Sequence, residues 1–241
     1  MIWRRSGSWV GYKFGYDGAD RLLAAEGIAG NNYKEYDITY DKSGNLNTLK
    51  RGEGSTVWDN LTYTYDQGRL NTVTDGSGSG NGVKNGTSVY QFDNAGNLTL
   101  DGNRNATISY NLLHLPGQIQ VSGQTVQYHY DGAGTKQRMS NTNGTVNTKY
   151  AGIFEYNENN YLTRIATTEG QIAVTSNGNA YTENYYLKDH LGNVRTVING
   201  EGTILQETEY FAFGLSISRS GIDAVNRYQF LNREKQPETG Y

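Results

Sequence analysis

The sequence of 241 residues contains no cysteine and only two prolines. Without cysteine, the chain has neither disulfide bonds nor thiol chemistry. Its mean hydropathy is −0.71, which is too polar for a thick apolar core. No apolar run approaches the ~20 residues that cross a bilayer. The charged start Met1–Arg5 is not followed by an apolar stretch, so we expect neither a membrane span nor a signal peptide.

The chain also has no large excess of either sign of charge. The 21 basic and 24 acidic residues are mixed along the chain and leave a net charge of −3. Nucleic-acid binding proteins carry a basic patch or stripe, so we expect no nucleic-acid partner. The three histidines stand apart, without the spacing of zinc ligands. We therefore expect no metal site and no cofactor.

The chain is rich in glycine and tyrosine. There are 31 glycines, and 20 tyrosines stand against 6 phenylalanines. Glycine permits tight turns, and a tyrosine ring buries an apolar body while its hydroxyl reaches water or a neighbour. This composition predicts an all-β chain, with a curved sheet that has one lined face and one wet face.

A repeated unit organises the sequence. It reads aromatic-x-aromatic-Asp, then two or three turn residues, then Gly-Asn or Gly-Arg and an apolar residue. The copies are Phe14–Leu22, Thr39–Leu46, Tyr63–Leu70, Tyr90–Leu98 and Tyr185–Ile198, with weaker ones at Ile108–Leu115 and Tyr128–Lys136. The spacing between copies is irregular, which argues against a solenoid of identical rungs and favours a long meandering sheet.

Each copy predicts a hairpin. Tyr63 and Tyr65 alternate with Thr62 and Thr64, so the two residue types lie on opposite faces of a strand. The aspartate ends the strand by bonding nearby backbone N–H groups, and the glycine takes a positive φ. The short segment Asp20–Glu26 is compatible with a helical turn or with an outgoing strand. The predicted turn residues are Asp17, Asp41, Gly44, Asp66, Gly68, Asp93, Gly96, Asp131, Gly134, Asp189, His190, Gly192, Asn193 and Arg195.

These features resemble the YD-repeat, or Rhs, family. The C-terminal third resembles the Rhs repeat-associated core of Bacteroidetes type, in three blocks at Tyr185–Arg195, Glu209–Leu215 and Arg227–Lys235, and in the tail Glu238–Tyr241. Ala212 stands where proline is usual, and the glycine that usually follows Asn232 is missing. The core-block residues are Tyr210, Phe213, Gly214, Tyr228, Phe230 and Glu234.

The resemblance implies an architecture and a role. Sheets of this family spiral into a hollow shell, which the core domain plugs, and many members release an enclosed toxin at an Asp-Pro-x-Gly-Leu motif. That motif is absent here. We therefore expect a C-terminal shell fragment or a truncated copy, with YD repeats over 1–150, a connector over 151–180 and a truncated core over 181–241.

The functional expectation is a non-catalytic scaffold. The chain would be a shell segment of a secreted or surface-exposed bacterial polymorphic toxin-type protein. Its partners would be a toxin or other cargo and further YD repeats, and open sheet edges would favour self-association. Asp189 and His190 do not form a catalytic dyad by proximity, because adjacent residues of a strand or turn point apart. The alternative is a carbohydrate-binding or adhesion module that stacks cell-surface glycans on tyrosine rings.

Overall fold

The computed structural model describes residues 2–5, 8–142, 147–175, 179–221 and 226–240, and Tyr241 of the expected tail lies outside them. The expected all-β fold is confirmed. The strands are β1 Ile2–Arg5, β2 Ser8–Tyr16, β3 Leu22–Ile28, β4 Tyr33–Tyr40, β5 Leu46–Glu53, β6 Thr56–Asp66, β7 Arg69–Asp75, β8 Gly86–Phe92, β9 Leu98–Asp101, β10 Ala106–Tyr110, β11 Pro116–Val121, β12 Gln124–Tyr130, β13 Lys136–Asn141, β14 Asn147–Ala151, β15 Phe154–Tyr156, β16 Leu162–Ala166, β17 Gly170–Thr175, β18 Ala180–Lys188, β19 Val194–Asn199, β20 Ile204–Tyr210 and β21 Ser216–Gly221. One 3-10 turn, η3, spans Phe230–Asn232.

The chain forms two compact units. Unit 1 comprises Met1–Asn105 and Phe211–Leu215, and unit 2 comprises Ala106–Tyr210 and Ser216–Tyr241. Within each unit, successive strands pair antiparallel as a meander. The segment Asp20–Glu26, for which the sequence left helix and strand open, lies mostly in β3. The sequence boundaries at 150 and 180 stay predictions.

The alternation of side chains gives the unit-1 sheet two unlike faces. Its inner cluster consists of Ile38, Leu49, Leu61 and Val73, with Tyr63 packed against it. On the other face, threonine hydroxyls pair across neighbouring strands, at 2.7 to 2.9 Å, in Thr39–Thr48, Thr64–Thr72 and Thr74–Thr87. Such cross-strand pairs stabilise the sheet and fix its register.

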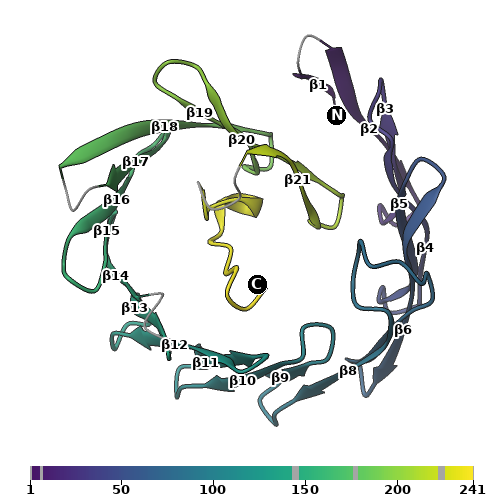
Figure 1. Ribbon diagram of the computed structural model, residues 1–241. Helices are drawn as coiled ribbons and strands as arrows, with labels where there is room; N and C mark the ends of the chain where they lie inside the picture. Colours follow the sequence, from purple (N-terminus) through teal and green to yellow (C-terminus); the bar gives the residue numbers. More distant parts are fainter. Residues whose placement is uncertain (1, 6–7, 143–146, 176–178, 222–225, 241) are drawn as a thin grey trace. The chain divides into compact units, whose positions relative to one another are not determined.

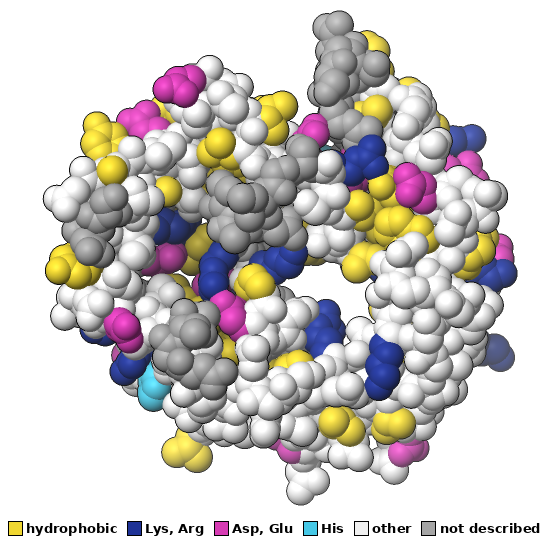
Figure 2. Space-filling view, in the orientation of Figure 1, with side chains coloured by type: hydrophobic (Ala, Val, Ile, Leu, Met, Phe, Trp, Pro, Cys, Tyr) yellow, Lys and Arg dark blue, Asp and Glu magenta, His cyan; other side chains and the backbone are white. Residues whose placement is uncertain are grey.

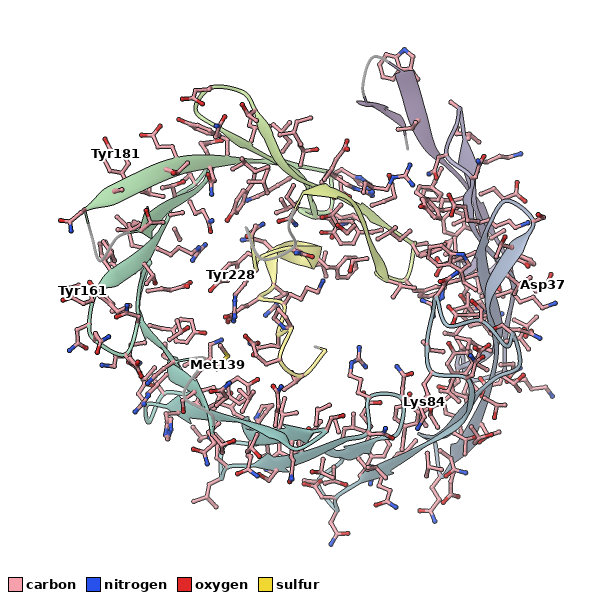
Figure 3. All side chains as sticks on the ribbon, in the orientation of Figure 1. Asp37, Lys84, Met139, Tyr161, Tyr181 and Tyr228 are labelled. Carbon is pink, nitrogen blue, oxygen red and sulfur yellow. The ribbon has the colours of Figure 1, made fainter. Side chains whose placement is uncertain are left out.

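In unit 2 a buried apolar cluster consists of Tyr186, Val194 and Val197, with Leu205 packed against it. Met139 is fully buried and lies, like Tyr228 of the C-terminal segment 226–240, on the inner side of the strands (Figure 3), whereas Tyr161 and Tyr181 project from the outer side. The C-terminal segment runs along the concave side of these strands (Figure 1). No helix in the described ranges is long and apolar enough to cross a membrane.

Candidate functional site

One backbone geometry recurs in the turns along the chain. The N–H of the first turn residue donates to the carbonyl of the fifth, and the N–H of the fourth donates to the carbonyl of the first. The fourth residue has a positive φ, which explains why glycine is frequent there. The first residues of these turns are Asp17, Asp41, Asp93, Asn111, Asp131, Asn157, Asp189, Asn199 and Phe211.

The turn aspartate holds this geometry with its carboxylate. Asp41 Oδ1 accepts the backbone N–H groups of Ser43 and Asn45, both at 2.8 Å, and Oδ2 accepts Asn45 Nδ2 at 2.9 Å. These hydrogen bonds, that of the Asn45 side chain foremost, hold the pKa of Asp41 below its usual range. Asp93 makes the same contacts, and Asp17 and Asp131 accept the two equivalent backbone N–H groups. The N–H donors lie two and four residues on from the aspartate.

Asp66 lies in a different turn. It is the last residue of β6 and pairs with Arg69, so that only Gln67 and Gly68 form the loop. Both have positive φ, at 48° and 79°. This is the two-residue hairpin whose twist matches the flanking strands.

Asp189 is bound by an arginine side chain as well as by its own turn, as Asp17 is by Arg21. It accepts the backbone N–H groups of Leu191 and Asn193, and Arg195 Nε donates to its Oδ2 at 2.9 Å. Arg195 also pairs with Glu209, which is buried, at 2.8 Å. Burial acts to raise the pKa of Asp189, but the hydrogen bonds of Asn193 and the charge of Arg195 outweigh it and lower that pKa. His190 is exposed at the turn.

Tyrosine hydroxyls link each of four hairpins to the one before it. The tyrosine that precedes the turn position donates to the carbonyl of the residue that opens the outgoing strand of the preceding hairpin. The pairs, at 2.7 to 3.0 Å, are Tyr40–Leu22, Tyr65–Leu46, Tyr130–Pro116 and Tyr210–Val194. The sequence indicated packing for these rings but not these bonds, because the acceptor lies 14 to 19 residues before the tyrosine and no fixed spacing marks it.

Other tyrosines of the repeat pack in the wall. Tyr63 and Tyr90 lie against the unit-1 core cluster, and Tyr128 is buried in unit 2. Burial raises the pKa of Tyr63 and of Tyr90 to about 12. These rings are therefore inner packing, and they do not form the exposed stacking row that the carbohydrate alternative requires.

The turn at Phe211 lacks the aspartate. Phe211 is buried, with its ring centroid 5.6 Å from those of both Tyr33 and Trp58. Without a carboxylate at the turn, the backbone N–H of Phe213 donates instead to Glu35 Oε2, at 3.2 Å. Glu35, from β4, thus replaces the missing turn carboxylate. Gly214, the fourth residue, has a φ of 86°.

Glu35 belongs to a charged cluster inside unit 1. It is fully buried, and the neighbouring Arg51 forms a salt bridge of 2.8 Å to the buried Asp59. Val83 donates its backbone N–H to the other oxygen of Asp59 at 2.7 Å. Burial raises the pKa of Glu35 to about 7, against the opposing charge of Arg51. No local sequence pattern marks this cluster, because its residues come from separate strands.

The C-terminal segment is held by polar contacts rather than by apolar ones. The hydroxyl of Tyr228 donates to Glu155 at 2.7 Å, and Arg164 donates to the same oxygen at 2.6 Å. The guanidinium of Arg164 lies 4.0 Å from the centre of the Tyr228 ring. Phe230 adds an aromatic contact to Tyr210 at 5.6 Å.

Glu234 makes a second attachment. It accepts the Tyr150 hydroxyl at 2.9 Å and forms a salt bridge with Lys136. Further bonds fasten the same segment to the sheet, in the pairs Tyr128–Gln236, Tyr186–Asn226 and Leu231–Asn193. Figure 2 shows acidic, basic and apolar side chains interspersed on this view of the molecule. Among the residues with described positions, no group of three or more acidic or histidine side chains could hold a metal ion.

These contacts attach the C-terminal segment to the sheet of unit 2. Glu155 and Glu234 each accept a tyrosine hydroxyl and pair with a cation, so their charges are neutralised inside the unit. Buried charges that are paired and hydrogen-bonded in this way fix a conformation. The core-block residues Tyr228 and Glu234 therefore lie where the C-terminal segment joins the sheet.

The comparisons with known proteins are consistent with the repeat pattern of the sequence. No family model matches the chain. The chain is 28% identical over 221 residues to the tRNA3(Ser)-specific nuclease WapA of Bacillus spizizenii, which covers 85% of the chain and 9% of WapA.

Solved structures show the same fold. The chain matches TcdB2-TccC3 with a TM-score of 0.63 and 16% identity, over 99% of the chain and 16% of that structure. The complex TcdB2-TccC3-Cdc42 matches with a TM-score of 0.60 and 16% identity, over 97% of the chain and 15% of that structure. The chain thus has an Rhs/YD-repeat shell-type fold related to TcdB2-TccC3 and WapA, and it spans less than a fifth of their lengths.

Proposed function

We propose that this chain is a non-catalytic wall segment of a YD-repeat shell in a larger toxin-type protein. The observation that carries the proposal is the set of hydrogen bonds that hold the hairpins of the sheet together. Turn carboxylates close several of the hairpins, and tyrosine hydroxyls join hairpins to the preceding ones. The likeness to TcdB2-TccC3 over 99% of the chain supports the same role.

The finer assignments belong to this proposal. The stretch 181–241 acts as the Rhs repeat-associated core of Bacteroidetes type, and its final segment plugs the sheet through Tyr228 and Glu234. The larger protein is secreted or displayed at a bacterial surface. Its cargo segment is another part of that protein, and further YD repeats extend the wall through sheet edges.

The test is limited proteolysis of the natural gene product. A segment that the shell encloses resists protease in the folded protein and is cut within minutes once urea opens the wall. A natural product of these 241 residues alone, or a neighbouring segment that is cut equally fast in both states, would contradict the enclosure.

A further inference from the structure

The wall of unit 1 has one junction that is built differently from its neighbours. The facing strands of two successive hairpins are joined by backbone hydrogen bonds. These strands separate as they approach the turn that follows Tyr65 or Phe92. Between β5 and β6 the ladder begins at Thr48–Thr62, and beyond it the Tyr65 hydroxyl reaches the carbonyl of Leu46 at 2.9 Å. Between β7 and β8 the ladder likewise ends at Thr72–Val89. The residue that corresponds to Tyr65 is Phe92, which has no hydroxyl.

A groove of about 590 Å³ lies where that bridge is missing. It is lined by Asn71 of β7, by Tyr90, Gln91 and Phe92 of β8, and by Asn94 of the following turn. The volume falls in the range of small-ligand sites. Near the groove, Arg69 Nη1 donates to the carbonyl of Asp93 at 2.9 Å.

The lining has the chemistry of a saccharide site. The side chains of Asn71, Gln91 and Asn94 are exposed, and each primary amide both donates and accepts, as sugar hydroxyls do. The half-buried ring of Phe92 offers apolar surface for a sugar ring.

Charge argues against an ionic ligand. Arg69 and Asp66 both line the groove, so its one positive and one negative formal charge balance. An ion of either sign would meet a like charge there, whereas a neutral sugar would not be repelled. We propose that the β7–β8 groove binds a neutral mono- or disaccharide, and that the absence of a hydroxyl at Phe92 keeps the groove open. This site is independent of the shell function and of the tyrosine rows.

The test uses the full 241-residue chain and saturation-transfer NMR with maltose, lactose, cellobiose and N,N′-diacetylchitobiose as probes. At least one disaccharide is expected to bind saturably, and Asn71→Ala combined with Gln91→Ala is expected to weaken that binding at least tenfold. Absence of binding to all four probes, or binding that survives the double substitution in a folded protein, would overturn the proposal.

A single-atom change tests the role of Phe92. Phe92→Tyr adds the hydroxyl that Tyr40 and Tyr65 carry at the corresponding positions of unit 1, and the corresponding acceptor is the carbonyl of Leu70, the second residue of β7. It is expected to reduce binding at least tenfold while leaving the protein folded. The matched control, Tyr65→Phe, removes a hydroxyl from the neighbouring junction and is expected to change binding less than twofold. Equal binding by wild type and Phe92→Tyr would refute the claim that the missing hydroxyl opens the groove.

Discussion

The backbone N–H of Phe213 donates to the carboxylate of Glu35, 178 positions away in the sequence, at 3.2 Å. In other turns of the chain the equivalent N–H is bound by the aspartate of its own turn, as Ser43 is by Asp41. The exchange of a local carboxylate for a distant one places a titratable group inside unit 1. Its ionisation has a calculable consequence for stability.

Glu35 is expected to make stability fall as pH rises. Its pKa is about 7 in the folded protein, above the ordinary value of 4.5, because burial disfavours the charged form. The folded state therefore binds the proton more tightly, so this contribution is full below pH 4.5 and is lost as pH rises through 7. We predict a loss on the order of 1–3 kcal/mol between pH 5 and pH 8.

Urea unfolding at pH 5, 6, 7 and 8 measures this effect. In Glu35→Gln, which keeps an acceptor for Phe213 but does not titrate, the dependence over this range is expected to flatten. If the free energy of unfolding changes with pH to the same extent in wild type and in Glu35→Gln, Glu35 is ruled out as the titrating group.

Asp189 is expected to stabilise its turn more than a single acceptor would. Asp189→Ala removes the bonds of two backbone N–H groups and of Arg195, and should cost about 1–2 kcal/mol. Asp189→Asn keeps one oxygen, which is the arrangement that Asn111 and Asn199 already use, and should cost less. Denaturation midpoints measure both. Identical losses for the two variants would show that the turn N–H bonds contribute nothing.

The hydrogen bond from the Tyr65 hydroxyl to the Leu46 carbonyl is expected to stabilise the protein by a typical amount for one hydrogen bond. Tyr65→Phe removes the bond to Leu46 and keeps the ring, so we predict a loss of about 0.5–1.5 kcal/mol. The control is Tyr16→Phe, since Tyr16 is 57% exposed at the equivalent position of the first repeat. Thermal unfolding compares the two. A Tyr16 variant that loses as much as the Tyr65 variant would contradict a specific role for the bridge.

The attachment of the C-terminal segment is expected to depend on Glu155. Glu155→Ala leaves Arg164 without its partner and removes the acceptor of Tyr228, which should cost about 3–5 kcal/mol. Glu158→Ala removes an exposed acid nearby and should change stability by less than about 0.5 kcal/mol. Hydrogen exchange of residues 226–240 gives a local readout. Unchanged protection there in the Glu155 variant would separate this carboxylate from the attachment.

Local patterns predicted most of the fold. The alternation of Tyr63 with Thr64 set the faces of β6, and Asp41 with Gly44 marked a turn, because both are properties of neighbours in sequence. The pairing of Glu35 with Phe213 could not be predicted in this way, since it depends on strands that meet only after folding. The groove beside Phe92 was likewise missed, because its signal is one absent hydroxyl in a repeat that otherwise continues.

The tyrosine bridges also give the wall a direction. Every bridging hydroxyl belongs to a residue later in the chain than the carbonyl that accepts it, as Tyr40 follows Leu22 and Tyr65 follows Leu46. During synthesis, when N-terminal parts fold first, each acceptor is therefore already in place when its donor leaves the ribosome. The sheet can grow hairpin by hairpin from its N-terminal end, and each tyrosine bridge can form as soon as its donor has been made.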